Sequence, residues 1–155
     1  MLKKKKIINF INAMLVALVI GAVVTVPTYA ITFNWSMEMS TNGRLVDGKK
    51  NGVYHKLSYG HVKIKGSIHT YSNKNGNGGA TNPLHFQLYN KNTGNCFGDI
   101  TKKPSGYAFG NVSFSGIYPK KVGGGNGYYL YIWRVDSDGT SLSASGTAYH
   151  YDYNK

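Results

Sequence analysis

Hydrophobic and polar residues alternate along most of the chain beyond residue 31, with the period of two that is typical of half-buried β-strands. In the run 32–39, Phe33, Trp35 and two methionines share one face, and polar residues share the other. The run 61–71 alternates in the same way, with valine and isoleucine on its apolar side. This pattern predicts strands, and no amphipathic helix is expected after residue 31.

Eight strands are expected, because turn signals recur about every ten residues. The expected strands are 32–39, 53–59, 61–71, 84–91, 96–100, one within 107–118, 127–135 and 140–153. Short strands joined by glycine-rich turns are typical of a β-sandwich or jelly roll, and a barrel is the alternative. The predicted fold class is therefore all-β: an antiparallel β-sandwich or jelly-roll-like fold of about eight strands, preceded by an N-terminal signal helix.

The run 127–135 is the most apolar part of the chain after the N-terminal leader. β-Branched and aromatic residues fill both of its alternating faces, which is typical of a strand that is covered on both sides. Turn residues 136–139 follow, so a central β-hairpin with 140–153 is expected. The expected partners are Val135 with Thr140, Trp133 with Leu142, Tyr131 with Ala144, and Tyr129 with Gly146. Trp35 and Trp133 are both predicted to be core residues.

Glycine, asparagine and proline mark the other connections. The predicted turns and loops are 42–52, 72–82, 92–95, 102–106 and 119–127. The glycine-rich loop 72–82 is expected to be exposed. Gly60 is expected to separate two strands, and Gly110, where the alternation changes phase, is expected to mark a β-bulge.

Residues 1–30 have the three parts of a secretory signal peptide. Four lysines precede the apolar stretch 13–26, and Thr28 and Ala30 occupy the −3 and −1 positions of a cleavage site. An uncleaved membrane anchor is the alternative, although the stretch is short for a span of about 20 residues. The prediction is a cleaved leader, 1–30, followed by a single secreted β-sandwich domain, 31–155, located outside the cell.

The predicted domain is strongly basic. The leader carries four lysines and no acidic residue, so its removal lowers the formal net charge from +12 to +8. A secreted domain of this charge is expected to adhere to anionic envelope polymers, acidic glycans or an anionic membrane surface. Cys96 is the single cysteine, so an internal disulfide is excluded, and burial in the core is favoured over an intermolecular disulfide.

The sequence contains no recognised catalytic or cofactor motif. Gly-x-Ser-x-Gly, His-Glu-x-x-His and the P-loop are missing, and the five histidines lack the spacing of a metal site. Asp136 and Asp138 resemble the start of a calcium loop, but the closing glutamate is missing and a turn is favoured. No spacing indicates the carboxylate pair of a glycosidase. The prediction is a non-enzyme without cofactor or metal, and an unrecognised hydrolase is the alternative.

The candidate ligand-binding residues lie on the polar face of the run 61–71. They are His61, Lys63, Lys65, Ser67, His69 and Tyr71. Residues i and i+2 on one strand face lie about 6.5–7 Å apart. Two lysines and two histidines therefore form a row that matches the repeating charges of a polyanion. An ordinary solvated face is the alternative, since lysine on an exposed strand also opposes aggregation.

Export, positive charge and the missing catalytic motifs together predict a secreted basic non-enzymatic binding protein of the cell exterior. Its expected partners are anionic envelope polymers or glycans. The alternative is a secreted antibacterial (bacteriocin-like) or toxin-like protein that acts on membranes or envelopes, and the same charge favours it. The sequence shows no pore-forming amphipathic segment after the leader, which favours the first hypothesis.

Overall fold

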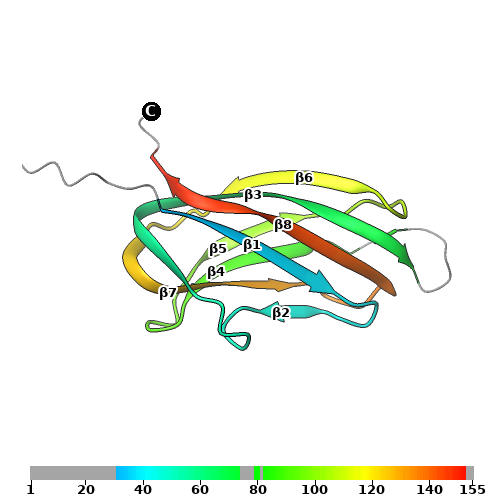
Figure 1. Ribbon diagram of the computed structural model, residues 1–155, viewed down its shortest axis with the longest axis horizontal. Helices are drawn as coiled ribbons and strands as arrows, with labels where there is room; N and C mark the ends of the chain where they lie inside the picture. The colour runs from blue at the N-terminus through cyan, green and yellow to red at the C-terminus, as the bar shows by residue number, and fades with distance from the viewer. Residues whose placement is uncertain (1–30, 74–78, 81, 153–155) are drawn as a thin grey trace, which may run out of the picture.

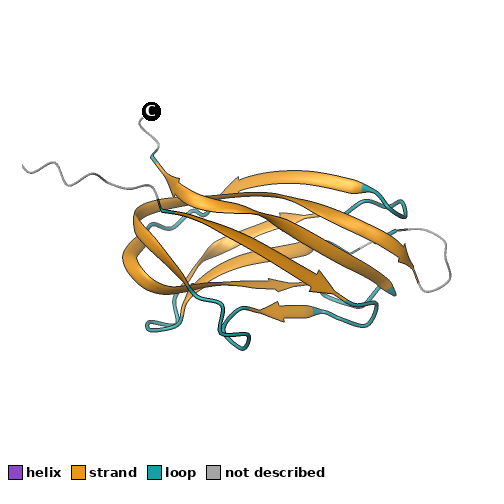
Figure 2. Cartoon of the chain, in the orientation of Figure 1, coloured by secondary structure: helices purple, strands orange, loops and turns teal. Residues whose placement is uncertain are grey.

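The computed structural model describes residues 31–73, 79–80 and 82–152. In that part the chain forms eight antiparallel strands and no helix, as predicted (Figure 2). The predicted leader lies outside the described residues, as do most of the predicted 72–82 loop and the last three residues. No helix long and apolar enough to cross a membrane occurs in the described part of the chain.

The strands form two packed layers (Figure 1). They are β1 (Thr32–Met39), β2 (Leu45–Asp47), β3 (His55–Asn73), β4 (Leu84–Asn90), β5 (Cys96–Lys102), β6 (Asn111–Ile117), β7 (Val122–Trp133) and β8 (Thr140–Tyr151). One layer, the β8 sheet, has the strand order β1-β8-β3-β6. The other layer, the β7 sheet, has the order β2-β7-β4-β5.

The pairing of the strands is nested. The first strand pairs with the last, β2 pairs with β7, β3 with β6, and β4 with β5, all antiparallel. The chain therefore runs as one long folded-back ribbon, with the β4–β5 hairpin at its closed end. The predicted pairing of 84–91 with 96–100 is confirmed by this hairpin.

The long strand β3 belongs to both layers. Its first residues, from His55 to Gly60, pair with β7, and the stretch from His61 onward pairs with β8. Gly60 was predicted to separate two strands, but the strand continues through it with a φ of 134°. A Cβ atom at this position would meet the imidazole of His150, so glycine allows the strand to turn from one sheet into the other.

Alternating side chains of the two sheets fill the space between them. The apolar residues of β1 point inward as predicted, and Val62 and Ile64 of β3 join them in the core. Trp35 is 7% exposed. Its ring centroid lies 5.6 Å from that of Phe86 and 6.0 Å from that of Phe114. The prediction that Trp35 is a core residue is confirmed.

The predicted hairpin between 127–135 and 140–153 is wrong. β7 and β8 lie in different sheets, and Trp133 pairs with Leu45 and His85 while Leu142 pairs with Met39 and Thr70. The two strands bury their apolar residues by facing each other across the sandwich. Residues 134–139 are the connection that crosses between the layers.

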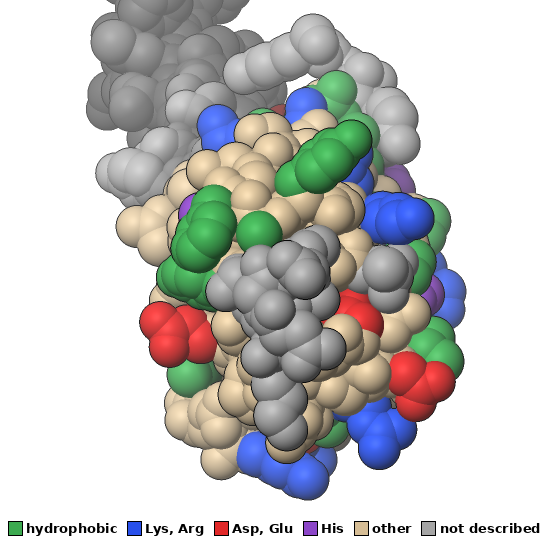
Figure 3. Space-filling view, turned by 90° about the vertical axis from the view of Figure 1, so that its right-hand side faces the viewer, with side chains coloured by type: hydrophobic (Ala, Val, Ile, Leu, Met, Phe, Trp, Pro, Cys, Tyr) green, Lys and Arg blue, Asp and Glu red, His purple; other side chains and the backbone are tan. Residues whose placement is uncertain are grey.

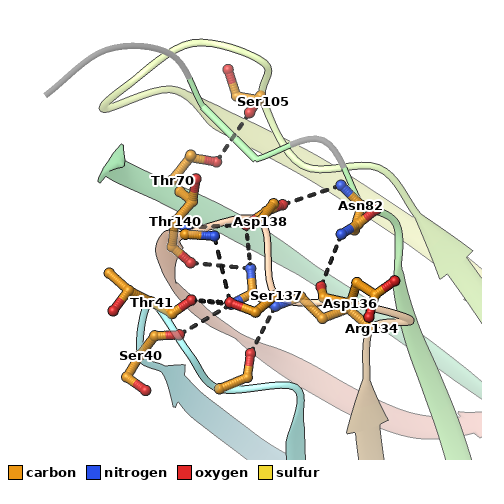
Figure 4. A network of polar contacts seen from close by, with 12 residues as sticks. Ser40, Thr41, Thr70, Asn82, Ser105, Arg134, Asp136, Ser137, Asp138 and Thr140 are labelled. Atoms are coloured by element: carbon orange, nitrogen blue, oxygen red, sulfur yellow. Dashed lines mark hydrogen bonds and ion pairs between the residues drawn. The ribbon is translucent and has the colours of Figure 1, made fainter. Parts of the chain in front are cut away.

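The side chain of Arg134 fixes the segment 134–139 that connects the two layers (Figure 4). Its side chain is fully buried, and its guanidinium donates to the backbone oxygens of Gly43 (2.8 Å), Ser40 (3.0 Å) and Thr140 (3.0 Å). It also donates to Asp138 Oδ1 at 2.7 Å. Burial lowers the pKa of Arg134 below its ordinary value, and the Asp138 carboxylate offsets only part of this effect. The segment that resembled a calcium loop is thus an arginine-anchored crossing.

The structure differs from four local predictions. The predicted turn 42–52 contains the short strand β2, and β7 begins at Val122, inside the predicted loop 119–127. Gly110 precedes β6 and forms no bulge, and the nearby Phe109 is 68% exposed outside any strand. Ala80, at the end of the predicted exposed loop, is completely buried. Local glycine content indicated turns here, but pairing with distant strands decided which residues became extended.

Candidate functional site

The predicted ligand-binding row stands on the outer face of β3. Val62, Ile64 and Ile68 point into the core, so the row residues point away from it, as the alternation predicted. Lys65 is exposed and Tyr71 is 40% exposed, whereas the remaining row residues are half-buried. Because β8 and β6 flank β3, the row runs along the middle of a sheet face.

Both lysines of the row lie against tyrosine rings of β8. The Lys63 ammonium lies 5.2 Å from the ring centroid of Tyr151, and the Lys65 ammonium lies 5.6 Å from that of Tyr149. These distances fall within the range of about 6 Å for cation–π attraction. The aromatic rings thus place two cations side by side and offset part of their mutual repulsion.

The other row residues are held by hydrogen bonds. His61 Nδ1 donates to the backbone oxygen of Tyr118 at 3.1 Å, and His69 Nδ1 lies 3.1 Å from Asn111 Oδ1. The His69 ring meets Tyr71 edge-on, with 4.7 Å between the centroids. The row is therefore an ordered surface.

Hydroxyl side chains of β6 and β8 flank the row on the same face, which we call the β8 face. They are Ser113, Ser115, Ser143 and Ser145, and Thr147 lies on the same face with its hydroxyl oxygen buried. Among the paired positions of this face, Glu38 on the edge strand β1 is the one carboxylate. The β8 face is thus rich in hydroxyl groups and positively charged along its centre.

The outer face of the other sheet, which we call the β7 face, is aromatic. Tyr129, Tyr131 and Trp133 of β7 stand directly opposite Tyr89, Gln87 and His85 of β4. Trp133 was predicted to be a core residue, and this prediction is wrong. The inward positions of β7 belong to Tyr128, Leu130 and Ile132, so strand parity places Trp133 on the outside, where it is half-buried.

The rings of the β7 face pack against one another. Trp133 stacks on His85, with 4.0 Å between the centroids and 9° between the planes. Tyr89 lies 5.7 Å from Tyr129 and 5.9 Å from Tyr131. Burial raises the pKa of the Tyr89 and Tyr129 phenols above its ordinary value, which keeps these hydroxyl groups protonated.

Carboxylates lie among these rings. Asp99 of β5 accepts a hydrogen bond from His85 Nδ1 at 2.6 Å, and Thr101 Oγ1 lies 3.2 Å from the same nitrogen. Asp47 of β2 stands opposite Tyr131. Cys96, at the β5 edge of this face, is half-buried and does not belong to the core, where its burial was favoured.

The β7 face was not predicted. The run 127–135 was interpreted as apolar on both sides, which predicts a cover on each side. Tyr54 and Tyr89 cover Tyr129, which is 8% exposed, whereas Tyr131 and Trp133 on the same side remain half-buried. The outward rings carry a polar tip, a phenol or an indole N–H, that Leu130 and Ile132 lack, but the inward Tyr128 carries one as well, so this signal alone did not separate the two sides. The alternation of 84–91 placed His85, Gln87 and Tyr89 on one side and indicated the same surface.

An open cleft lies beside the edge strands β1 and β2. It has a volume of about 740 Å³ and brings Glu38, Asp47 and Lys50 to one hollow. The sequence did not indicate this proximity. No group of three or more candidate metal ligands occurs among the described residues.

One end of the sandwich shows a different distribution of charge. In the end view of Figure 3, lysine and arginine side chains lie dispersed among acidic and hydrophobic ones over the visible described surface. This end presents no field of a single sign. The β8 face is therefore the better candidate for binding an anionic polymer.

Comparison with known proteins identifies no family. No protein-family model and no curated protein matches the chain. The structure of infectious bursal disease virus Gx strain is 12% identical, with 81% of this chain and 32% of that chain covered and a TM-score of 0.43. The VP2 subviral particle of infectious bursal disease virus is 16% identical, with 81% and 33% covered and a TM-score of 0.43.

A second kind of solved structure is also similar. The Yersinia pseudotuberculosis-derived mitogen (YPM) is 16% identical, with 81% of this chain and 91% of that chain covered and a TM-score of 0.35. The chain spans about a third of the two viral chains that it matches. Similarity at this level carries no conclusion about function.

Proposed function

We propose that the protein is a basic, non-enzymatic binding protein of the cell exterior, and that it binds anionic envelope polymers or acidic glycans along the β8 face. The observation that carries the proposal is the placement of Lys63 and Lys65 along the middle of a hydroxyl-rich face. Among the described paired positions of this face, Glu38 on the edge strand β1 is the single carboxylate.

The physical basis is a match of spacing and chemistry. Successive outward residues of a strand lie about 6.5–7 Å apart, so neighbouring lysines can contact successive anionic groups of one polymer. The hydroxyl groups around them donate hydrogen bonds to phosphate or carboxylate oxygens. Tyr149 and Tyr151 offer rings on which sugar units can pack. Each contact releases counterions, so the affinity falls as the salt concentration rises.

The finer features of the proposal are a jelly roll and export. The nested pairing of eight strands in two sheets supports a jelly roll over a barrel. The charge, apolar stretch and small residues of 1–30 support a cleaved signal peptide and an extracellular location. N-terminal sequencing of the secreted protein tests the cleavage before Ile31.

The binding experiment compares two pairs of lysines. The Lys63→Gln, Lys65→Gln double variant removes two charges from the β8 face, and Lys120→Gln, Lys121→Gln removes two from the exposed segment before β7. Affinity for poly(glycerol phosphate) is measured across a range of NaCl concentrations. We expect the first pair to lose most of the affinity and to have the shallower salt dependence. Equal losses from both pairs would mean diffuse charge attraction without a defined site.

The toxin-like alternative is tested with the same preparation. Vesicles of anionic lipid that contain a self-quenching dye are mixed with the wild-type protein, and growth inhibition is assayed in parallel. We expect binding without dye release, because no amphipathic segment is present among the described strands to insert into lipid. Dye release or killing would favour the alternative.

A further inference from the structure

We propose that the β7 face is a second binding site, separate from the β8 face, and that it takes a neutral, hydroxyl-rich polysaccharide. The two outer faces of the sandwich differ in chemistry. The β8 face carries hydroxyl groups around two lysines. The β7 face carries a cluster of aromatic rings flanked by carboxylates. A single ligand class does not suit both.

The outward rings of β7 are not needed by the core. The core is complete without Tyr131 and Trp133, whose strand neighbours Leu130 and Ile132 already fill the interior. The outward rings are half-buried because Trp133 stacks on His85 and Tyr131 meets Tyr89 edge-on. Aromatic rings that remain partly exposed at the centre of a sheet contribute to the free energy of binding when a ligand covers them, as at binding hot spots.

Polar groups lie among the rings of the β7 face. Outward tyrosines and Trp133 each combine an apolar ring with a hydroxyl or N–H group. Gln87 stands opposite both Tyr131 and Asp99, so an amide and a carboxylate lie between the aromatic side chains. A sugar offers C–H groups to the rings and hydroxyl groups to these polar atoms. An apolar protein surface would leave the polar atoms without partners.

The charges around the rings favour a neutral ligand. Asp47 and Asp99 flank the rings on two sides. At the end of the face, Tyr54 packs edge-on against Tyr129, and the Lys91 ammonium lies 4.0 Å from the Tyr54 ring centroid. Carboxylates repel a polyanion and accept hydrogen bonds from neutral hydroxyl groups. The same residues therefore select a neutral ligand and exclude the polymer proposed for the β8 face.

The rings of the β7 face are preorganised for binding. The imidazole of His85 is fixed by Asp99 at 2.6 Å, and the indole of Trp133 stacks on that imidazole. The ring cluster thus has a defined shape before a ligand arrives, which lowers the entropy cost of binding.

The experiment measures retention on insoluble cellulose, chitin, mannan and β-1,3-glucan in about 0.5 M NaCl, where the Debye length is only about 4–5 Å and charge attraction is screened. We expect the wild type to be retained by at least one of them. Tyr131→Ala and Trp133→Ala should each weaken this binding about tenfold or more, and Tyr131→Phe should keep most of it. The Lys63→Gln, Lys65→Gln variant is the matched control and should bind like the wild type.

Fluorescence provides a second readout that does not depend on truncation. Trp133 is half-exposed and Trp35 is buried, so a soluble oligosaccharide of the retained polymer should shift the emission of the wild type to shorter wavelength. Trp133→Phe should abolish this shift and keep the fold.

Several results would overturn the proposal. They are no retention on any of the four polymers at high salt, unchanged binding by both alanine variants, or a fluorescence shift that persists in Trp133→Phe. Two further outcomes would assign the face to a protein partner. One is a wild-type dimer that dissociates in the Trp133→Ala variant, and the other is selective binding of a proline-rich peptide. Loss of poly(glycerol phosphate) binding in low salt concerns only the β8 face, so the two proposals fail separately.

Discussion

Arg134 is the residue on which the crossing between the sheets depends. Its guanidinium is fully buried, and it donates to four backbone oxygens, those of Ser40, Thr41, Gly43 and Thr140, and to the Asp138 carboxylate. Arg134→Met would leave Asp138 without its cation, and we expect a loss of about 3–5 kcal/mol in the free energy of unfolding. Arg134→Lys should not restore it, because an ammonium cannot reproduce the fork of donors. Urea unfolding measures both.

Arg44 is the matched control for this experiment. It forms an ion pair with Asp136 at 3.3 Å, but both side chains are mostly exposed, at 61% and 72%. Exposed pairs contribute about 0–1 kcal/mol, so Arg44→Met should change stability little. Similar losses in Arg44→Met and Arg134→Met would contradict the anchoring role.

His55 makes stability depend on pH. Its ring stacks on Phe33 with 3.8 Å between the centroids, and burial lowers its pKa below the ordinary value of 6.5. The unfolded chain therefore takes up the proton more readily. The contribution of His55 to stability is complete above pH 6.5 and is lost as the pH falls below it. Urea unfolding at pH 7.5 and pH 5.5 should show this decrease, and His55→Gln should reduce it.

The two tryptophans show what strand parity alone can and cannot establish. Trp35 lies in a run with one apolar face, so its burial could be predicted. Trp133 lies in a run that is apolar on both faces, and only the sheet partners of β7 decide its side. We expect Trp35→Ala to cost about 3–5 kcal/mol. Trp133→Ala should cost less than half as much, as measured by urea unfolding, and equal costs would restore the core interpretation.

At the scale of the strand, Gly60 allows β3 to serve both sheets. Its φ of 134° is accessible to glycine, and a side chain would collide with His150. We expect Gly60→Ala to lower the free energy of unfolding by about 1–3 kcal/mol. Gly123→Ala is the control, because Gly123 pairs with Tyr59 next to the bend and a Cβ there meets no atom within 4 Å. Equal losses in thermal or urea unfolding would show that the bend tolerates a side chain.

Strands could be predicted more reliably than their partners. The runs 32–39 and 84–91 alternate cleanly and became β1 and β4 with almost the expected bounds. The prediction of a β7–β8 hairpin was wrong because a four-residue polar segment has the same sequence pattern in a hairpin turn and in a connection between two sheets. The decisive contacts of Arg134 reach Ser40 and Gly43, more than 90 positions away, and no local pattern reveals them.

The candidate sites follow the same division. The β8 row lies on a single strand, so alternation alone assembled it. The β7 face needs three strands in register, with Asp99 reaching His85 from β5 and Trp133 from β7. Such a surface is visible only after the pairing is known.

At the scale of the whole molecule, the nested pairing joins the first described strand to the last. Thr32 pairs with Tyr149, and Met39 pairs with Leu142. Contacts between residues so distant in sequence require large loops to close before they stabilise the fold. We therefore expect folding in milliseconds to seconds, roughly as in other β-sandwiches. Stopped-flow fluorescence of Trp35 in the Trp133→Phe variant measures this rate, and complete folding within microseconds would contradict the expectation.

The pairing of β1 with β8 also determines how the domain responds to force. Because the two strands are antiparallel, the beginning of β1 and the end of β8 lie at the same end of the pair. Tension applied between these two points acts along the interstrand hydrogen bonds, which run perpendicular to the strands. The bonds are then loaded one after another, as in a zipper opened from its end. Stretched between two anchors, the sandwich would open at low tension, starting from the pair Thr32 and Tyr149.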